Sequence, residues 1–232
     1  MSDAMSTPVI RLLLVDDHAI VRAGYRHLLR RQAHLDLIDD AGSAEEAYLL
    51  YRQNRPDVVV TDMALPGQSG LELTRRLLAI DPQARVLIFT MHGSPDFAQV
   101  ALRAGARGYV TKSSPAETLL NAIADVAQGR RALSPDVAQA LALARVEGDT
   151  GLDALTPREF EVLRMLLRPM PVSDIAATLH LSEKTVCNLH YQIKRKLGVT
   201  NDIELTRRML PLLEQADASL EASTAPLHDN GV

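Results

Sequence analysis

The stretch VIRLLLVDDH, residues 9–18, is the first short apolar run of this chain and the start of an α/β pattern. Its first seven residues carry a single charge, and two aspartates follow directly. Four more short apolar runs come later, at residues 35–38, 57–61, 85–89 and 107–110. Runs that are apolar almost throughout are typical of strands buried on both faces of a parallel sheet.

Amphipathic segments separate these runs and predict helices. The expected helices span residues 19–32, 43–54, 69–79, 95–104 and 115–128. Strands that alternate with helices in this way form a parallel sheet with helices on both faces. We therefore expect a five-stranded α/β domain over residues 9–129, with its ligands at the carboxyl ends of the strands.

The pattern becomes wholly helical after residue 154. Thr156, Pro157 and Glu159 combine a helix cap, a proline suited to the first turn and a carboxylate that returns to the cap. Ser173 and Ser182 are expected to cap the next two helices. These signals predict a small all-α domain that follows the α/β domain.

A fourth helix is expected to begin at Thr200 or Asn201, and Pro211 is expected to stop or kink it. The second part of the chain is then a four-helix domain. The expected boundaries are a linker with one helix over residues 130–154, the helical domain over residues 155–213 and a disordered tail over residues 214–232.

The net charge of −4 over 232 residues is uneven along the chain. Residues 1–154 carry net −3, residues 155–211 carry net +3, and the residues from 212 onward carry four acids and no base. A basic segment beside an acidic one predicts an anionic partner for the basic segment alone. The single cysteine excludes an internal disulfide and a Cys-rich zinc site. The lack of a long apolar run or an apolar leader predicts a cytoplasmic protein without membrane contact.

Chemically reactive side chains follow four of the predicted strands. Asp16 and Asp17 follow the first strand, Asp62 the third, Thr90 the fourth and Lys112 the fifth. Because the carboxyl ends of parallel strands meet at one edge of a sheet, we expect these side chains in one crevice. Clustered carboxylates repel one another unless a cation lies among them, and Mg²⁺ prefers carboxylate and water oxygens. The alternative is that these acids only cap the following helices.

The motifs VDDH (15–18), TDMALPG (61–67), FT (89–90) and GYVTK (108–112) stand at these strand ends. Together they resemble the receiver domain of bacterial two-component response regulators, a flavodoxin-like domain. The resemblance implies that a phosphoryl group is carried by one aspartate and that its oxygens are bound by a threonine and a lysine. In this chain these residues are Asp62, Thr90 and Lys112. The implied Mg²⁺ ligands are Asp16, Asp17, Asp62 and the backbone carbonyl of Ala64.

Two positions next to this site need separate treatment. Tyr109 matches the aromatic switch residue of the receiver family, which turns inward as Thr90 moves toward the phosphoryl group. Ordinary packing at the sheet edge is the alternative for Tyr109. Met91 departs from the family, where the residue after the threonine is usually small. A larger side chain there can slow the access of phosphodonors or of the hydrolytic water.

The segment SEKTVCNLHYQIKRKLG (182–198) predicts an amphipathic helix. At about 100° per residue, the side chains of Val186, His190, Ile193 and Leu197 share one face, which we expect to be buried. The candidate DNA-binding residues on the other side are Lys184, Thr185, Cys187, Asn188, Tyr191, Gln192, Lys194 and Arg195. A basic helix after a short helix and a tight turn is typical of a helix-turn-helix that enters the DNA major groove. The alternative is a solvated helix face.

Three segments, LTPREFEVLRML (155–166), SDIAATLHLSEKTV (173–186) and IKRKLGV (193–199), resemble the LuxR-type output domain of NarL/FixJ response regulators. The resemblance implies binding to double-stranded DNA at an inverted repeat, with a dimer contact through residues 203–210. Cys187 stands where many family members have lysine, so one cation that would attract phosphates is missing.

We therefore predict a phosphorylation-controlled transcription regulator that is not an enzyme. A sensor histidine kinase would phosphorylate Asp62 with Mg²⁺ as cofactor, and the active homodimer would bind DNA, with RNA polymerase as a further candidate partner. A phosphatase on this fold would need a second carboxylate two residues after Asp62, where this chain has Ala64. The remaining alternative is a pseudo-receiver regulator that binds DNA independently of phosphorylation.

Overall fold

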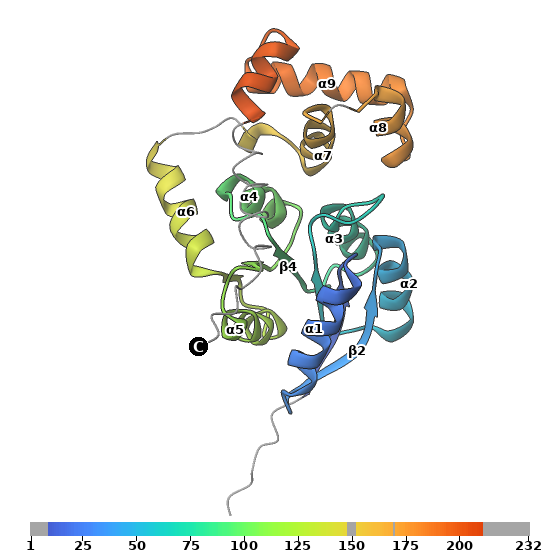
Figure 1. Ribbon diagram of the computed structural model, residues 1–232, viewed down its shortest axis with the longest axis vertical. Coiled ribbons are helices and arrows are strands. Elements are labelled where there is room, and N and C mark those ends of the chain that lie inside the picture. The colour runs from blue at the N-terminus through green and yellow to red at the C-terminus, as the bar shows by residue number, and fades with distance from the viewer. Residues whose placement is uncertain (1–8, 148–151, 169, 211–232) are drawn as a thin grey trace, which may run out of the picture.

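A computed structural model describes residues 9–147, 152–168 and 170–210 and shows an α/β domain followed by a helical domain (Figure 1). Within the described residues, the sheet has the strand order β2-β1-β3-β4-β5-β6, and every neighbouring pair is parallel. The strands are β1 (Ile10–Val15), β2 (Leu35–Ala41), β3 (Val58–Thr61), β4 (Val86–Thr90), β5 (Gly108–Thr111) and β6 (Ala132–Leu133). The parallel α/β fold expected from the sequence is confirmed.

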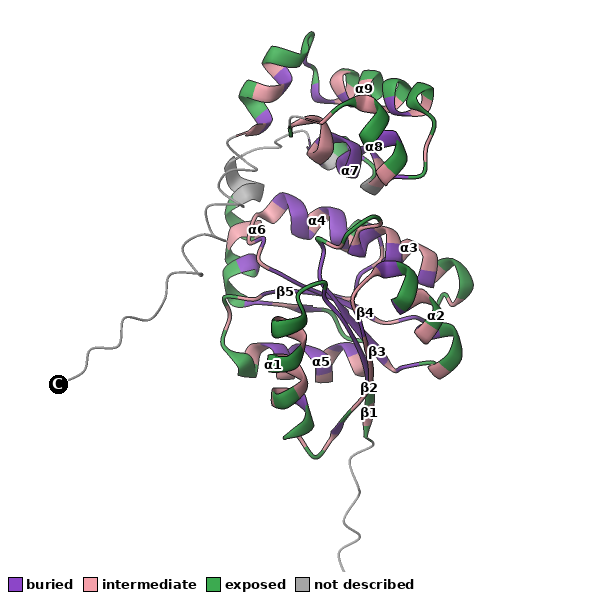
Figure 2. Cartoon of the chain, turned by 45° about the vertical axis from the view of Figure 1, so that its right-hand side comes forward, coloured by how far each residue is buried: buried purple, intermediate pink, exposed green. Residues whose placement is uncertain are grey.

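Helices cover both faces of the sheet, whose strands are the most buried part of the domain (Figure 2). They are α1 (Ala19–Arg30), α2 (Ala44–Asn54), α3 (Gly70–Ile80), α4 (Pro95–Arg103) and α5 (Ala116–Ala127). Leu12 and Leu14 of β1 pack in one core with α1 and α5, whereas Leu13 and Val15 pack in another with α2, α3 and α4. Alternate side chains of one strand thus fill two cores, which explains the continuously apolar runs.

The expectation of five strands was wrong by one, because residues 132–133 form a sixth strand. Ala132 pairs with Gly108 and Leu133 pairs with Tyr109. The amide of Ser134 also donates to the carbonyl of Tyr109 at 3.0 Å. Two residues are too few to show a hydrophobic period, so our prediction from the sequence assigned them to the linker. The start of the linker is therefore part of the sheet.

The linker helix α6 (Pro135–Glu147) is held at the end of β5. Asp136 accepts a hydrogen bond from the Thr111 hydroxyl at 2.8 Å, and Val137 is fully buried. Helix α6 also packs against α4. The face formed by α4 and β5 is thus covered by the linker.

The helical domain contains the short 3₁₀ helix Leu152–Ala154, α7 (Pro157–Leu166), α8 (Val172–Thr178) and α9 (Glu183–Leu197), followed by helical residues 202–210. Its core includes Phe160, Leu163, Ile175, Val186 and Ile193, which are all buried. None of the described helices combines the length and apolar character that a bilayer crossing requires.

Most of the predicted helix starts agree with the structure. Thr156 and Glu159 form both hydrogen bonds of a capping box, and Ser182 accepts a hydrogen bond from the Thr185 amide. Ser173 was wrongly expected to cap α8. Pro171 holds that position, and the Ser173 hydroxyl donates to the Asp174 carboxylate inside the first turn. The expected stop at Pro211 and the expected tail lie outside the described residues.

Gly70 begins α3 and lies directly against the backbone of Asp62. A Cβ atom built at Gly70 would lie 2.0 Å from the Asp62 carbonyl oxygen. The Gly70 amide also donates to the carbonyl of Met63 at 3.0 Å. The absence of a side chain at Gly70 therefore lets α3 approach the loop that begins with Asp62.

We expect Gly70→Ala to lower the free energy of unfolding by at least about 2 kcal/mol, because the backbone must move to relieve the contact. Gly24→Ala in α1 is the control, since a Cβ atom there meets no heavy atom within 4 Å. This control is expected to raise stability by up to about 1 kcal/mol. Urea denaturation followed by circular dichroism measures both. A Gly70→Ala protein as stable as wild type would contradict the argument.

Candidate functional site

Lys112 connects two buried carboxylates at the carboxyl edge of the sheet. Its Nζ atom lies 2.5 Å from Oδ2 of Asp16 and 2.6 Å from Oδ2 of Asp62. All three side chains are nearly buried, with exposed fractions of 9% for Lys112, 4% for Asp16 and 8% for Asp62. Residues from the ends of three different strands therefore meet in one cluster, as the sequence predicted.

The electrostatics of this cluster favour the charged form of Lys112. Burial by itself would lower the pKa of the ammonium, but the charges of Asp62 and Asp16 and their hydrogen bonds outweigh burial. The pKa of Lys112 is therefore raised above its ordinary value of 10.5. The side chain remains a cation at neutral pH.

Asp17 lies beside Asp16 at this edge and pairs with His18. Its Oδ1 atom lies 2.7 Å from Nδ1 of His18, and its side chain is about one-third exposed. Ligand atoms of Asp16, Asp17 and His18 all lie within 4.8 Å of one another. The oxygens of Asp16 and Asp17 fit the preference of Mg²⁺ for hard carboxylate ligands, with water completing the coordination. His18 was not singled out in the sequence.

The backbone around Asp62 is held on both sides. The Asp62 amide donates to the carbonyl of Val15 at 2.8 Å, which ties the end of β3 to the end of β1. The Ala64 amide donates to Oδ1 of Asp62 at 3.2 Å. One carboxylate oxygen of Asp62 thus faces Lys112, and the other faces the loop that leads to α3.

Thr90 of β4 and Tyr109 of β5 lie near the cluster that Lys112 forms with the two aspartates. Thr90 is buried at the end of β4, and its carbonyl accepts the Lys112 amide at 2.8 Å. Tyr109 is fully buried in β5, and its hydroxyl donates to the carbonyl of His92 at 2.7 Å. Burial, with the charge of Asp62, raises the pKa of Tyr109 well above 10. Met91, which follows Thr90, is half-buried.

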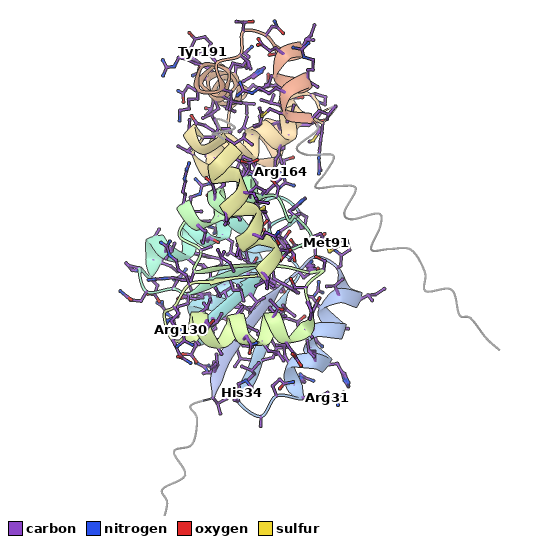
Figure 3. All side chains as sticks on the ribbon, turned by 90° about the vertical axis from the view of Figure 1, so that its left-hand side faces the viewer. Arg31, His34, Met91, Arg130, Arg164 and Tyr191 are labelled. Carbon is purple, nitrogen blue, oxygen red and sulfur yellow. The ribbon has the colours of Figure 1, made fainter. Side chains whose placement is uncertain are left out.

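The outward face of α9 carries most of the candidate DNA-binding residues. Lys184, Cys187, Asn188, Tyr191, Gln192 and Arg195 are exposed, and Thr185 and Lys194 are half-buried. Tyr191 lies at the end of the molecule farthest from the α/β domain (Figure 3). The buried face holds Val186, Ile193 and Leu197 as expected, together with a half-buried His190.

Two of the cations near the end of α9 are already engaged by carboxylates. Nζ of Lys194 lies 2.8 Å from Oδ1 of Asp202, which also lies 2.9 Å from Nε2 of His190. Lys196 bonds the buried Glu159 at 2.6 Å. The bond from Lys194 lowers the pKa of Asp202, so that carboxylate stays charged. Lys194 is therefore a weaker candidate for a phosphate contact than the exposed Arg195.

A contact between the domains was not predicted from the sequence. The buried Glu161 of α7 accepts a hydrogen bond from the Ser69 hydroxyl at the start of α3, and its other oxygen lies 2.9 Å from Arg158. That oxygen also lies 3.6 Å from Nη2 of Arg75. No local signal marks this contact, because Ser69 and Glu161 are 92 residues apart.

Aromatic side chains form a second link between the domains. The ring of His92 stacks on Phe97 of α4 with centroids 4.7 Å apart. The ring of Phe97 meets Phe160 of α7 edge-on at 5.0 Å. Arg164, which lies where the two domains meet in Figure 3, has its guanidinium 5.6 Å from the centre of Phe97. Because Tyr109 bonds the carbonyl of His92, packed groups run from β5 to α7.

Comparison with known proteins covers both domains. Residues 12–124 match the family of response regulator receiver domains, and residues 153–209 match the luxR family of bacterial regulatory proteins. Response regulator GacA of Pseudomonas aeruginosa is 38% identical over 200 residues, covering 85% of this chain and 94% of GacA. Response regulator UvrY of Escherichia coli K12 is 34% identical over 201 residues, covering 85% of this chain and 92% of UvrY.

Solved structures agree with this assignment. A LuxR-family two-component response regulator from Aurantimonas is 51% identical, covers 60% of this chain and 99% of its own, and has a TM-score of 0.58. RcsB of Salmonella enterica serovar Typhimurium, bound to the rprA promoter with phosphomimetic BeF₃⁻, is 25% identical. It covers 86% of this chain and 98% of its own, with a TM-score of 0.70.

The fold and the strand-end cluster define a receiver domain joined to a LuxR-type helix-turn-helix domain. The chain belongs to the NarL/FixJ family of response regulators.

We expect Lys112→Met to lower the free energy of unfolding at pH 7, without divalent cations, by about 3 kcal/mol, because two buried carboxylates lose their shared cation. Adding Asp62→Asn should recover part of the loss. The folded pKa of Lys112 lies above the unfolded value of 10.5, so the contribution persists below pH 10.5 and disappears as the pH rises through the folded pKa.

Urea denaturation of the single and double variants measures this effect. Lys184→Met, at an exposed position of α9, is the control and should change stability by less than about 0.5 kcal/mol. A Lys112→Met protein no less stable than this control would show that the buried carboxylates are neutralised in another way.

Proposed function

We propose that this protein is a transcription regulator whose DNA binding is controlled by phosphorylation of Asp62 by a sensor histidine kinase. The observation that carries the proposal is the bonding of one buried ammonium, that of Lys112, to both Asp16 and Asp62. A carboxylate held beside a fixed cation is suited to accept a phosphoryl group, whose added charge needs compensation.

The chemistry assigns a part to each residue. A carboxylate oxygen of Asp62 attacks the phosphorus of a phosphohistidine, and the bond from phosphorus to the histidine nitrogen breaks. Lys112 and the Thr90 hydroxyl bind the oxygens of the transferred group. Asp16, Asp17, Asp62 and the Ala64 carbonyl would hold Mg²⁺, which offsets negative charge when bound. With Ala64 two residues after Asp62, we expect no enzymatic activity on other substrates.

DNA binding is assigned to the exposed face of α9. Asn188 can pair bidentately with adenine, while Lys184 and Arg195 can contact phosphates. RcsB, which covers 86% of this chain, has been solved bound to promoter DNA. We infer the same use of α9 here, in a homodimer that pairs through helical residues 202–210 and can contact RNA polymerase.

We infer that phosphorylation acts on the contact between the domains. Movement of Thr90 toward the phosphoryl group would shift Tyr109, and Tyr109 reaches Phe160 through His92 and Phe97. A second route starts at Asp62, which touches Gly70, the neighbour of the Ser69 that bonds Glu161. A change at Asp62 thus has two physical routes to α7.

Helix α9 is exposed even though the two domains are in contact, so we infer that this contact limits pairing of the helical domains and not access to α9. Helix α7 docks on the receiver while Tyr191 stays 67% exposed, so docking does not bury the DNA-binding face. Met209, in helical residues 202–210, lines a small apolar cavity together with Phe97 and Phe160. Phosphorylation would therefore act by freeing two helical domains to pair rather than by uncovering α9.

The central test is phosphorylation with acetyl phosphate and Mg²⁺, followed by recovery and sequencing of the organism's own fragmented genomic DNA. Wild type is expected to form a phosphoprotein and to enrich inverted-repeat sites only when phosphorylated. Asp62→Asn should lose both properties. Asn188→Ala should be phosphorylated normally but should lose enrichment, because a base contact costs about 1–3 kcal/mol.

Identical DNA enrichment by wild type and Asp62→Asn, with no phosphoprotein formed, would instead identify a pseudo-receiver that binds DNA constitutively. Enrichment by Asn188→Ala equal to that of wild type would remove this residue from the DNA-binding face.

Weakening the contact between the domains should activate the unphosphorylated protein. We expect Glu161→Gln to raise its DNA affinity about 5-fold to 10-fold, in line with a coupling free energy of about 1–3 kcal/mol. The affinity of the phosphorylated form should change little, since its domains are already released. Fluorescence anisotropy with a recovered DNA site measures affinity, and small-angle X-ray scattering measures domain separation.

Glu117→Gln, which removes the same charge from an exposed position of α5, is the control. If both variants bind DNA like wild type and keep its scattering profile, the Ser69–Glu161 contact does not restrain the domains.

A further inference from the structure

We propose that Arg22 is a positioning residue for the Mg²⁺ ligands. It fixes the peptide group that joins Asp16 to Asp17 and so orients these two ligands. The proposal rests on the Mg²⁺ site assigned above. Arg22 lies in α1 and does not contact any side-chain oxygen that is proposed to bind Mg²⁺. The sequence patterns did not single it out.

Arg22 reaches across the end of the sheet with two separate hydrogen bonds. Its Nη1 atom donates to the backbone carbonyl of Asp16 at 2.5 Å. Its Nε atom donates to Oδ2 of Asp40, near the end of β2, at 3.0 Å. The side chains of Arg22 and Asp40 are 20% and 17% exposed, so both bonds are largely shielded from water. The guanidinium is therefore anchored to β2 while it holds the end of β1.

The carbonyl that Arg22 holds belongs to the peptide between the two adjacent aspartates. On the preceding side, the Asp16 amide donates to the carbonyl of Ala41 at 3.1 Å. The His18 amide donates to Oδ1 of Asp16 at 2.8 Å. With its carbonyl fixed as well, this turn cannot rotate freely. Arg22 thereby helps to fix the backbone from which the carboxylates of Asp16 and Asp17 extend.

Arg22 also passes close to Gly42. A Cβ atom built there would lie 3.4 Å from Nη1 of Arg22, so the guanidinium runs close over this position. Arg26, one turn further along α1, also bonds the Asp40 carboxylate, at its other oxygen. Arg26 therefore shares the carboxylate partner of Arg22, whereas the bond to the Asp16 carbonyl is made by Arg22.

Charge and position predict opposite effects when Arg22 is removed. Loss of a nearby cation makes the acidic edge more negative, which favours Mg²⁺ binding. Loss of the bond to the Asp16 carbonyl frees the two carboxylates, which opposes binding, because partners that orient metal ligands are commonly worth about 10-fold to 100-fold in affinity. The sign of the change therefore separates a positioning role from a purely electrostatic one.

The experiment is calorimetric titration of full-length protein with Mg²⁺ alone, at constant ionic strength. We expect Arg22→Gln to bind Mg²⁺ at least about 10-fold more weakly than wild type. Arg26→Gln, the matched control, should bind as tightly as wild type or slightly more tightly. With acetyl phosphate, Arg22→Gln should need more Mg²⁺ for half-maximal phosphorylation but should approach the wild-type rate at saturating Mg²⁺.

Arg22→Gln binding Mg²⁺ as tightly as Arg26→Gln would overturn the proposal. If thermal denaturation shows that Arg22→Gln does not fold, the pair Arg22→Lys and Arg26→Lys decides instead. Lysine keeps the charge but cannot form the fork that joins two acceptors, so only Arg22→Lys should weaken binding. If wild type does not bind Mg²⁺ at all, the Mg²⁺ site itself is rejected. If wild type and Arg22→Gln bind Mg²⁺ equally well, the site stands and only the role of Arg22 is rejected.

Discussion

Lys112 bonds both Asp16 and Asp62, and this pairing holds together the edge of the sheet where β1, β3 and β5 end. Two carboxylates are almost fully buried at one edge of a sheet, and without a cation between them their repulsion would oppose folding. The ends of β1, β3 and β5 must therefore stay aligned. Pairing of Val15 with Thr61, of Thr61 with Ile88 and of Thr90 with Thr111 provides that alignment across the sheet. Any group that changes the charge of Asp62 changes the charge balance between Lys112 and the two carboxylates.

The same edge is connected to the helical domain through packed groups rather than through the linker alone. Gly70 touches Asp62 and stands next to Ser69, which bonds the buried Glu161. Phe97 contacts Phe160 and belongs to the helix that follows β4. Packed interiors respond to a local change by switching between arrangements rather than by gradual deformation. A small displacement at the edge can therefore alter the docking of α7.

Local patterns were sufficient to predict most of the fold. Continuous apolar runs located β1 to β5, and the capping box of Thr156 and Glu159 located α7. The same reasoning missed β6, because Ala132 and Leu133 are a strand only through pairing with β5. It also misplaced the cap of α8, because Pro171 caps that helix without a side-chain bond. For the candidate site, the residues at the strand ends were predicted, whereas Arg22 and Glu161 were not.

Local properties of the sequence, namely hydrophobic period and cap chemistry, were enough to predict β1 to β5, most helix starts, and the acids and the cation at the strand ends. The folded structure alone reveals that Lys112 bonds two carboxylates at once and that Arg22 holds the Asp16 carbonyl. It also decided that Glu161 is buried against Ser69 while α9 stays exposed. These contacts depend on the distances and directions of side chains from separate elements, which packing alone brings together.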